Sequence, residues 1–381
     1  MKEGRKEGRA VFPVFPVLPV LLSFMPLLTL TDRGLYCEPG DFFVDPWEPV
    51  DRAVVTHAHG DHASWGSQAY LTSAPGLGVL RARLQPGAAI RGISYGEPVT
   101  LNGVTISLHP AGHILGSSQV RIEHRGEVWV VSGDYKTDPD PTCAPFEPVR
   151  CHTFVTESTF GLPIYRWPQQ AEVFDEINSW WRANAAGGKT SLLFGYTLGK
   201  AQRLLAGLDP SIGPILTHGA VERMTVAYRE AGVPLPPTRY AGTTERKADS
   251  RGGIVIAPPY SSGSPWLRRF APYSTGFASG WMLVRGARRR RSLDRGFALS
   301  DHVDWPSLHA AIEATGAGEV WVTHGYTGPV VRWLQEKGIG AKAVQTRFEG
   351  ERDDEVSEIS EEETAPLPPR PEGTRPAASR S

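Results

Sequence analysis

The chain has few cysteines for its 381 residues. Cys37, Cys143 and Cys151 are an odd number, and none of them forms a C-x-x-C pair. A disulfide framework depends on an even set of cysteines in an oxidising compartment, so none is predicted here. The sequence therefore favours reduced thiols and a cytoplasmic location.

The chain also lacks an excess of charge of either sign. Its 40 Lys and Arg against 41 Asp and Glu give a formal net charge of −1, which excludes a globally basic nucleic-acid binder. Any contact with phosphate must come from a local patch or from a metal. The strongest basic run lies in residues 285–296 and includes Arg288, Arg289, Arg290 and Arg291. This run either grips a nucleic-acid backbone or forms a solvated hairpin tip. Lys136 is a second candidate for a phosphate contact.

No apolar run has the length of a membrane span, and we predict no membrane partner. The apolar stretch within residues 1–24 follows a basic segment, as in a signal peptide, but Pro13, Pro16 and Pro19 interrupt any helix. We expect Met25 to be the true start and residues 1–24 to be a non-native or disordered extension. Residues 349–381 are acidic and then rich in proline, which predicts a disordered tail.

Strand and helix patterns are both present. Between residues 35 and 160, short β-branched runs alternate with Gly, Pro and Asp, which predicts strands, with a hairpin turn at residues 124–127. Helical spacing begins at Pro168. It predicts helices within residues 168–188, 198–208, 304–316 and 328–338, with strands at 190–196 and 319–325. Strands interleaved with helices indicate an α/β or α+β fold.

The segment VVTHAHGDHASWG, residues 54–66, places His57, His59, Asp61 and His62 within six positions. Buried polar groups need partners to offset their desolvation, and a metal ion is the obvious partner for this set. His57 and His59 are two apart, so on an extended segment they point to the same side and can hold one ion. Asp61 and His62 follow Gly60 and turn toward a second position.

This cluster is not isolated, because apolar strands repeatedly end in residues of the kind that bind metals. The residues that follow or close such strands are His57, Asp134, Glu157, His302 and His324, and His113 follows a further strand. Strand ends of one sheet lie along one rim, where site residues collect on a rigid scaffold. We therefore expect these side chains to converge.

The order H-x-H-x-D-H, G-H, S-G-D and a distal H-G resembles the metallo-β-lactamase-fold hydrolases. The resemblance implies two metal ions. The first would be held by His57, His59, His113 and Asp134, and the second by Asp61, His62, His324 and a bridging Asp134. Imidazole and carboxylate ligands suit two Zn²⁺ ions, but the same set accepts Mn²⁺.

Three further segments narrow the resemblance. VTESTFG with Glu157, LSDHVDW with His302 and WVTHG with His324 resemble motifs A, B and C of the β-CASP nucleases, and residues 196–205 resemble a helix start early in their cap domain. From about residue 29 to 348 the chain looks most like the bacterial DNA ligase-associated exonuclease family. This implies a metallo-β-lactamase αββα sandwich, formed by residues 25–165 and 297–348, with a β-CASP-like cap at 166–296. It also implies catalytic roles for Asp61, Glu157 and His302, with Asp45 supporting the ligand loop.

The implied activity is metal-dependent hydrolysis of phosphodiesters by a DNA exonuclease that trims ends in repair alongside an ATP-dependent DNA ligase. An RNA nuclease is the alternative, because a histidine such as His324 in motif C goes with RNA cleavage in β-CASP enzymes. A small-molecule hydrolase, such as a thioesterase or lactonase, would have no use for Glu157 and His302. A nucleic-acid-binding scaffold without turnover would not need the intact ligand set.

Overall fold

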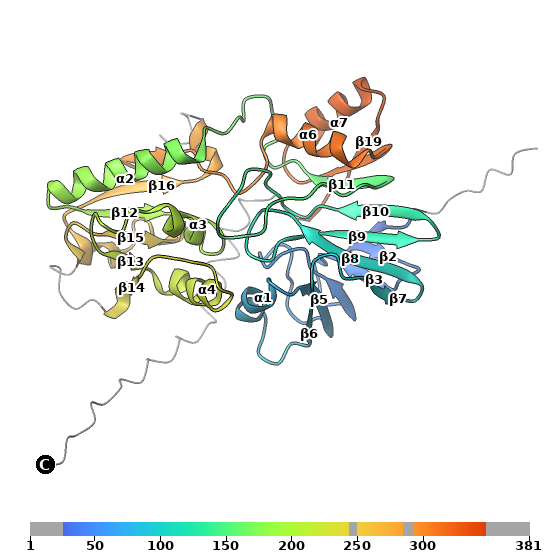
Figure 1. Cartoon of the computed structure of the whole chain (residues 1–381), viewed down its shortest axis with the longest axis horizontal. Coiled ribbons are helices and arrows are strands. Elements are labelled where there is room, and N and C mark those ends of the chain that lie inside the picture. Colours follow the sequence, from blue (N-terminus) through green and yellow to red (C-terminus); the bar gives the residue numbers. More distant parts are fainter. Residues whose placement is uncertain (1–25, 244–249, 285–292, 348–381) are drawn as a thin grey trace, which may run out of the picture.

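The computed structural model describes residues 26–243, 250–284 and 293–347. These residues form three β-sheets with helices packed against them, a mixed α and β architecture (Figure 1). The predictions for residues 1–24, for residues 349–381 and for the four arginines 288–291 lie outside the described residues. No helix in the described part of the chain combines the length and apolar character that a membrane span requires.

The first sheet has six strands in the order β1-β2-β3-β4-β5-β6. Its first three strands are antiparallel neighbours, and β3 to β6 run parallel. The strands are β1 (Thr29–Thr31), β2 (Gly34–Cys37), β3 (Phe42–Val44), β4 (Arg52–Val54), β5 (Ala69–Ser73) and β6 (Ile90–Ile93).

The second sheet has seven strands in the order β19-β18-β11-β10-β9-β8-β7. Its β7 to β10 half is antiparallel and its β10 to β19 half is parallel. The strands are β7 (Val99–Leu101), β8 (Val104–Pro110), β9 (Ser118–His124), β10 (Glu127–Val131), β11 (Thr153–Glu157), β18 (Glu319–Thr323) and β19 (Gly340–Ala343).

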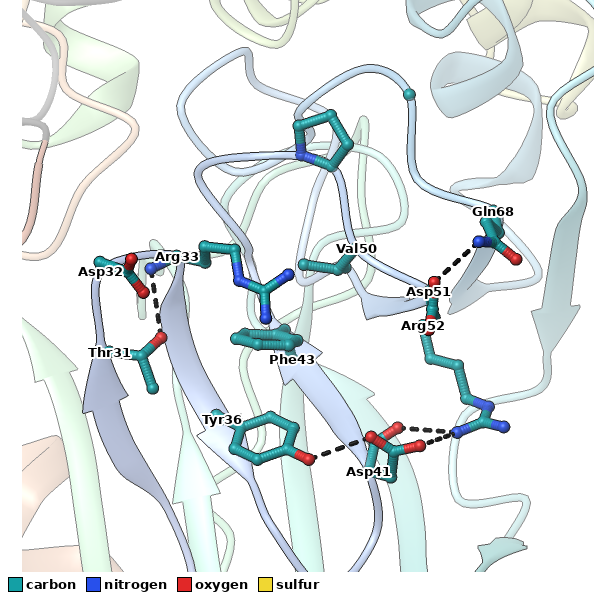
Figure 2. A pocket seen from close by; sticks show the side chains of 12 residues that line it. Thr31, Asp32, Arg33, Tyr36, Asp41, Phe43, Val50, Asp51, Arg52 and Gln68 are labelled. Carbon is teal, nitrogen blue, oxygen red and sulfur yellow. Dashed lines mark hydrogen bonds and ion pairs between the residues drawn. The ribbon is translucent and has the colours of Figure 1, made fainter.

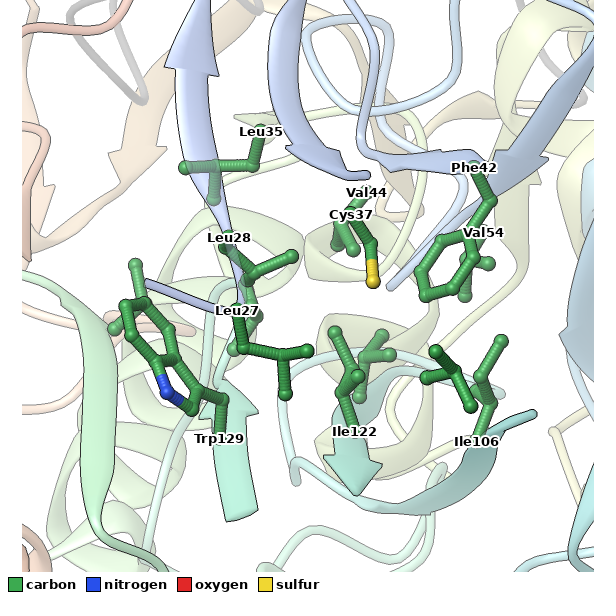
Figure 3. Packing of buried hydrophobic residues seen from close by; sticks show 14 of the residues in the cluster. Leu27, Leu28, Leu35, Cys37, Phe42, Val44, Val54, Ile106, Ile122 and Trp129 are labelled. Atoms are coloured by element: carbon green, nitrogen blue, oxygen red, sulfur yellow. The ribbon is translucent and has the colours of Figure 1, made fainter. Parts of the chain in front are cut away.

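These two sheets pack face to face around one apolar core (Figure 3). Alternate side chains of a strand point to opposite faces, so Leu35 and Cys37 of β2 reach this core while Tyr36 points outward. From the second sheet, Ile106 and Ile122 fill the same space.

Helices cover the outer faces of both sheets. On the first sheet, α1 (Leu77–Arg83) and α4 (Gly219–Glu230) pack over residues such as Ala53 and Tyr70. On the second sheet, α6 (Trp305–Thr315) and α7 (Thr327–Glu336) pack over Val320 and Val322. The layers therefore run helix, sheet, sheet, helix.

The third sheet is parallel throughout and has the order β14-β13-β15-β12-β16-β17. Its strands are β12 (Thr190–Phe194), β13 (Ile215–Thr217), β14 (Arg239–Tyr240), β15 (Ile254–Ala257), β16 (Tyr273–Ala278) and β17 (Arg295–Phe297). One face packs against α2 (Gln170–Ala186) and α3 (Lys200–Gly207). The other face packs against the short 3-10 helices η4 (Pro265–Phe270) and η5 (Gly280–Leu283), while η1 (Ala241–Thr243) and η3 (Pro259–Ser261) lie in connecting loops.

The hairpin predicted at residues 124–127 is present between β9 and β10, where His124 pairs with Glu127. Arg125 and Gly126 have φ values of 51° and 83°. Two central residues with positive φ make the turn whose twist matches that of the flanking strands. The predicted helices correspond to α2, α3, α6 and α7.

Candidate active site

The predicted site residues come from loops that follow strands of all three sheets. His57, His59, Asp61 and His62 follow β4 of the first sheet. His113, Asp134, Glu157 and His324 follow or close β8, β10, β11 and β18 of the second sheet, and His302 follows β17 of the third. The expectation that these strands share one sheet is therefore wrong. A polar residue after an apolar run shows where a strand ends. It does not show to which sheet that strand belongs.

A first group of buried ligand atoms belongs to His57, His59, His113 and Asp134, and these atoms lie within 4.8 Å of one another. His59 Nδ1 is 3.0 Å from His57 Nε2 and 3.1 Å from His113 Nε2. Asp134 Oδ2 is 3.6 Å from His57 Nε2 and 3.9 Å from His113 Nε2. Three ring nitrogens and one carboxylate oxygen thus converge on one point.

Each of His59 and His113 has a second ring nitrogen outside this group, and the contact of that nitrogen shows where the ring carries its proton. His59 Nε2 lies 3.1 Å from the Leu198 carbonyl oxygen, and His113 Nδ1 lies 2.9 Å from the Asp301 carbonyl oxygen. A carbonyl oxygen only accepts, so both of these nitrogens carry the proton. Burial lowers the pKa of His59 to about 4, and burial with neighbouring imidazoles lowers the pKa of His113 well below its usual value. Both rings are therefore neutral.

It follows that His59 Nδ1 and His113 Nε2 face each other with lone pairs and cannot hydrogen-bond. A divalent cation between the two nitrogens would remove this conflict. Histidines that bind metals usually donate their other ring N–H to a carbonyl or carboxylate, as His59 and His113 do here. The first group fits a metal ion.

A second group of ligand atoms belongs to Asp61, His62 and His324. His62 Nε2 is 3.4 Å from Asp61 Oδ2 and 3.4 Å from Asp134 Oδ2. Asp61 Oδ1 and His62 Nε2 are buried and lack a hydrogen-bond partner among the described residues. Asp134 Oδ2 lies between this group and the first. The buried His/Asp groups could bind metal ions.

Charged neighbours shift the pKa values of residues in the second group. Although burial opposes it, the carboxylates of Asp61, Asp134 and Asp45 raise the pKa of His62 well above its usual value. Burial also acts against ionisation of Asp61, but the neighbouring His62 holds the pKa of that carboxyl below its usual range. Acidic and imidazole groups that keep each other charged at this density need a cation or shared protons to offset their burial.

Asp45 supports the ligand loop. Its Oδ2 lies 2.7 Å from His62 Nδ1 and accepts from Thr56 Oγ1 at 2.6 Å, while Oδ1 accepts from the Thr56 N–H at 2.8 Å. Asp45 has a φ of 46°, a left-handed conformation that is strained for a residue other than glycine. Gly133 also approaches Thr56 closely, because a Cβ there would lie 2.6 Å from Thr56 Oγ1. This glycine lets the loop with Asp134 close on the loop with His57.

Glu157 and His302 form a buried pair beside the candidate metal ligands. His302 Nδ1 lies 3.0 Å from Glu157 Oε1 and 3.0 Å from Oε2. The Tyr135 N–H donates to Glu157 Oε1 at 2.9 Å, which fixes the carboxylate. Glu157, His302 and Asp134 also have ligand-type atoms within 4.8 Å of one another. This arrangement can hold an imidazole in one orientation next to the candidate metal centre.

The side chain of Lys136 contacts other groups of the protein. Its side chain is 1% exposed, and its ammonium donates to the Asp138 carbonyl oxygen and lies 3.9 Å from Asp140 Oδ2. Burial, with the nearby Arg203, lowers the pKa of Lys136 to about 8. The structure gives Lys136 internal partners, so the predicted phosphate contact stays a prediction.

Two cavities differ in their relation to the ligands. A cavity of about 430 Å³ lies over the outer face of the first sheet, where the Asp41 carboxylate accepts from Tyr36 and Arg52, and no candidate ligand lines it (Figure 2). A smaller cavity of about 40 Å³ is lined by Asp45, Asp61, His62 and His324 among others. The second group of candidate ligands therefore lines this smaller cavity.

Sequence reasoning missed the groups that orient the ligands from outside. These are the Leu198 and Asp301 carbonyls, and Lys200 and Arg203, which hold the Asp301 carboxylate. Leu198, Lys200 and Arg203 lie in the segment 196–205, whose resemblance to a cap helix was the available signal.

The chain is similar to curated proteins that are named as enzymes acting on nucleic acids. No protein-family model matches the sequence. The chain is 33% identical over 323 residues to a probable DNA ligase of Opitutus terrae, covering 84% of this chain and 31% of that protein. It is 29% identical over 144 residues to the endoribonuclease ysh1 of Aspergillus fumigatus, covering 36% of this chain and 16% of that protein. With YSH1 of Saccharomyces cerevisiae it is 30% identical over 124 residues, 32% of this chain and 15% of that protein.

The chain thus spans a third or less of the length of these curated relatives. Among solved structures, a protein of unknown function from Enterococcus faecalis V583 is similar, with a TM-score of 0.51 and 12% identity, covering 79% of this chain and 80% of that chain. At this identity the likeness concerns the fold alone.

Proposed function

We propose that this chain is a metal-dependent phosphodiester hydrolase of the β-CASP nuclease type. The observation that carries the proposal is Asp134 Oδ2, which lies between two buried ligand groups and beside the Glu157–His302 pair. The relatives named as endoribonucleases and as a DNA ligase support a nucleic-acid substrate. In this proposal residues 25–165 and 297–348 are a metallo-β-lactamase domain, which agrees with the helix-sheet-sheet-helix layers, and residues 166–296 are an inserted cap.

The proposed cofactor is a pair of Zn²⁺ ions, with Mn²⁺ as the alternative. His57, His59, His113 and Asp134 would hold one ion, and Asp61, His62, His324 and Asp134 the other. Such a pair lowers the pKa of a bound water and neutralises charge on the phosphate oxygens. On binding the ion His62 would release its Nε2 proton, and Asp45 would keep the other proton on Nδ1, so that the Nε2 lone pair would face the ion.

His302 is the proposed general acid, and Glu157 orients it. Since Nδ1 donates to Glu157, the proton for the leaving oxygen of the substrate is to come from Nε2. General acid catalysis by a positioned side chain contributes about 10²–10⁴ in rate. A hydrolase acting on thioesters or lactones has no comparable need for this pair.

DNA is the proposed substrate, and the proposed role is exonucleolytic trimming of ends alongside an ATP-dependent DNA ligase. The similarity to a probable DNA ligase extends over 84% of this chain and supports this choice. RNA cleavage is the second candidate, favoured by the endoribonuclease relatives and by His324 at motif C.

The test offers DNA and RNA of one sequence, single- and double-stranded and labelled at either end, to protein loaded with Zn²⁺ or Mn²⁺. A ladder of mononucleotides released from DNA is the expected result and gives the polarity. Preferential cutting of RNA, or cuts in circular substrates, would favour the second candidate. Protein that binds no metal, or that cleaves no phosphodiester, would contradict the whole proposal.

A further inference from the structure

Two of the candidate metal ligands are oriented by backbone carbonyls that lie far away in the sequence. His59 donates to the carbonyl of Leu198, which is 139 residues away, and His113 donates to that of Asp301, which is 188 residues away. A carbonyl can fix the orientation of a histidine ring only if the chain segment that carries the carbonyl is itself fixed. The question is therefore what fixes residues 198 and 301.

Two cations of α3 fasten the Asp301 segment. The Asp301 carboxylate lies 2.8 Å from Lys200 Nζ through Oδ2 and 2.8 Å from an Arg203 guanidinium nitrogen through Oδ1. Lys200 also donates to the Leu299 carbonyl at 2.9 Å, and Arg203 donates to the Ser300 carbonyl. Residues 299–301 are thus bound to α3 at three consecutive positions.

These charges are buried. The side chains of Lys200, Arg203 and Asp301 are 0%, 4% and 6% exposed. Burial works against ionisation, yet Lys200 and Arg203 keep the pKa of Asp301 below its usual range. Arg203 has further partners in Asp140 Oδ2 at 3.3 Å and Gln170 Oε1 at 3.0 Å. A buried network whose charged groups satisfy one another rigidifies the segments that it joins, and we therefore expect this cluster to hold residues 299–301 against α3.

The same helix also fixes the Leu198 carbonyl. α3 begins at Lys200, two residues later, after Gly199 with a φ of 87°. A Cβ at Gly199 would lie 2.2 Å from Ile114 Cγ2, so only glycine lets the chain pass this close to the ligand loops. The Gly199 N–H donates to Gln202 Oε1 at 2.8 Å, which locks the start of the helix.

We propose that Asp301, clamped by Lys200 and Arg203, is a positioning residue of the metal centre that acts through His113. Since α3 also fixes the Leu198 carbonyl, this helix sets the orientation of both His59 and His113. The orientation of these two histidines then depends on the position of α3. The proposal rests on the proposed function as far as metal binding is concerned. Outer contacts of metal-binding histidines affect metal affinity by about 10- to 100-fold.

The test measures Co²⁺ binding by the full chain, because the visible spectrum of Co²⁺ reports the geometry of its ligands. Asp301→Asn keeps the backbone carbonyl and the side-chain size but weakens the clamp. The double variant Lys200→Met/Asp301→Asn removes one cation and one anion together and leaves Arg203 paired with Asp140. The matched control is Glu222→Gln, which removes a carboxylate of α4 that accepts from Thr217 and Thr238 and contacts no ligand.

The expected result is a Co²⁺ dissociation constant about 10- to 100-fold higher in both clamp variants, with an altered spectrum and unchanged far-UV circular dichroism. The control should bind Co²⁺ as the wild type does. Wild-type affinity and spectrum in the clamp variants would overturn the inference. Failure of the wild type itself to bind Co²⁺ would instead contradict the proposed function.

A measurement on the metal-free wild type does not depend on variant folding. In a ¹⁵N histidine spectrum, His59 should carry its proton on Nε2 and His113 on Nδ1, and both protons should exchange slowly. The opposite tautomer at either ring would also overturn the inference.

Discussion

Nδ1 of His302 lies 3.0 Å from both carboxylate oxygens of Glu157, across 145 residues of sequence. Glu157 closes β11 of the second sheet, and His302 follows β17 of the third. The pair therefore joins two sheets at the candidate metal centre. Substitutions can separate what this pair contributes to catalysis from what it contributes to the stability of the fold.

His302→Ala should lower kcat on a nucleic acid by about 10²–10⁴, because the proposed general acid is lost. Metal content should stay normal, since His302 is outside the two proposed ligand sets. The assay is single-turnover cleavage of labelled DNA together with metal analysis. His124→Ala, on the hairpin between β9 and β10, is the matched control and should behave as wild type. Full activity in His302→Ala would remove the general acid from the mechanism.

Glu157→Gln should also slow cleavage, but its effect should depend on His302. Glu157 acts by orienting the imidazole, so the double variant Glu157→Gln/His302→Ala should be no slower than His302→Ala alone. Residues that act as one unit are non-additive in a double-mutant cycle. Additive effects in the kcat values would show that Glu157 contributes independently, for example as a metal ligand in its own right.

Asp134→Asn should abolish activity and reduce the bound metal, because Asp134 Oδ2 lies within 3.9 Å of ring nitrogens from His57, His62 and His113. An amide has a similar shape but offers neutral ligand atoms. Metal analysis and circular dichroism on the same preparation check both points. Asp209→Asn, at an exposed turn, is the control for the substitution itself. A fully active Asp134→Asn protein would contradict the metal mechanism.

The local parts of the site could be predicted from the sequence. His57, His59, Asp61 and His62 are close in the chain, and strand ends marked Asp134, Glu157 and His324. The structure brings these residues together with His113 and His302. The turn at Arg125 and Gly126 was equally accessible, because two-residue hairpin turns depend on local chemistry.

The rest depends on long-range packing that no local pattern encodes. The strands that lead to the site residues belong to three sheets, and strand pairing across more than a hundred residues is not visible in spacing. The contact of His59 with the Leu198 carbonyl involves a backbone atom, which every residue type possesses. The partners of Lys200 and Arg203 likewise follow from how α3 packs against residues 299–301.

Outside the site, His309 provides a test of stability against pH. Its ring stacks on Trp333 at 3.6 Å between centroids and meets Trp305 edge-on at 4.1 Å. Neither ring nitrogen has a hydrogen-bond partner among the described residues. Burial, with the charge of Lys337, lowers the pKa of His309 to about 4. The folded protein therefore holds this ring neutral at pH values where an exposed histidine is protonated.

Between about pH 6.5 and pH 4 the unfolded chain binds a proton at His309 that the folded protein does not bind, so the free energy of unfolding falls as the pH falls. His309→Phe keeps an aromatic ring between the tryptophans and removes this titration. The variant should therefore gain about 1–3 kcal/mol relative to wild type on going from pH 7 to pH 4, after allowance for partial solvent screening. Urea unfolding of both proteins at the two pH values measures the difference, with His124→Phe as the exposed control. A stability difference between His309→Phe and wild type that does not change with pH would show that the folded protein protonates His309 as readily as the unfolded chain does.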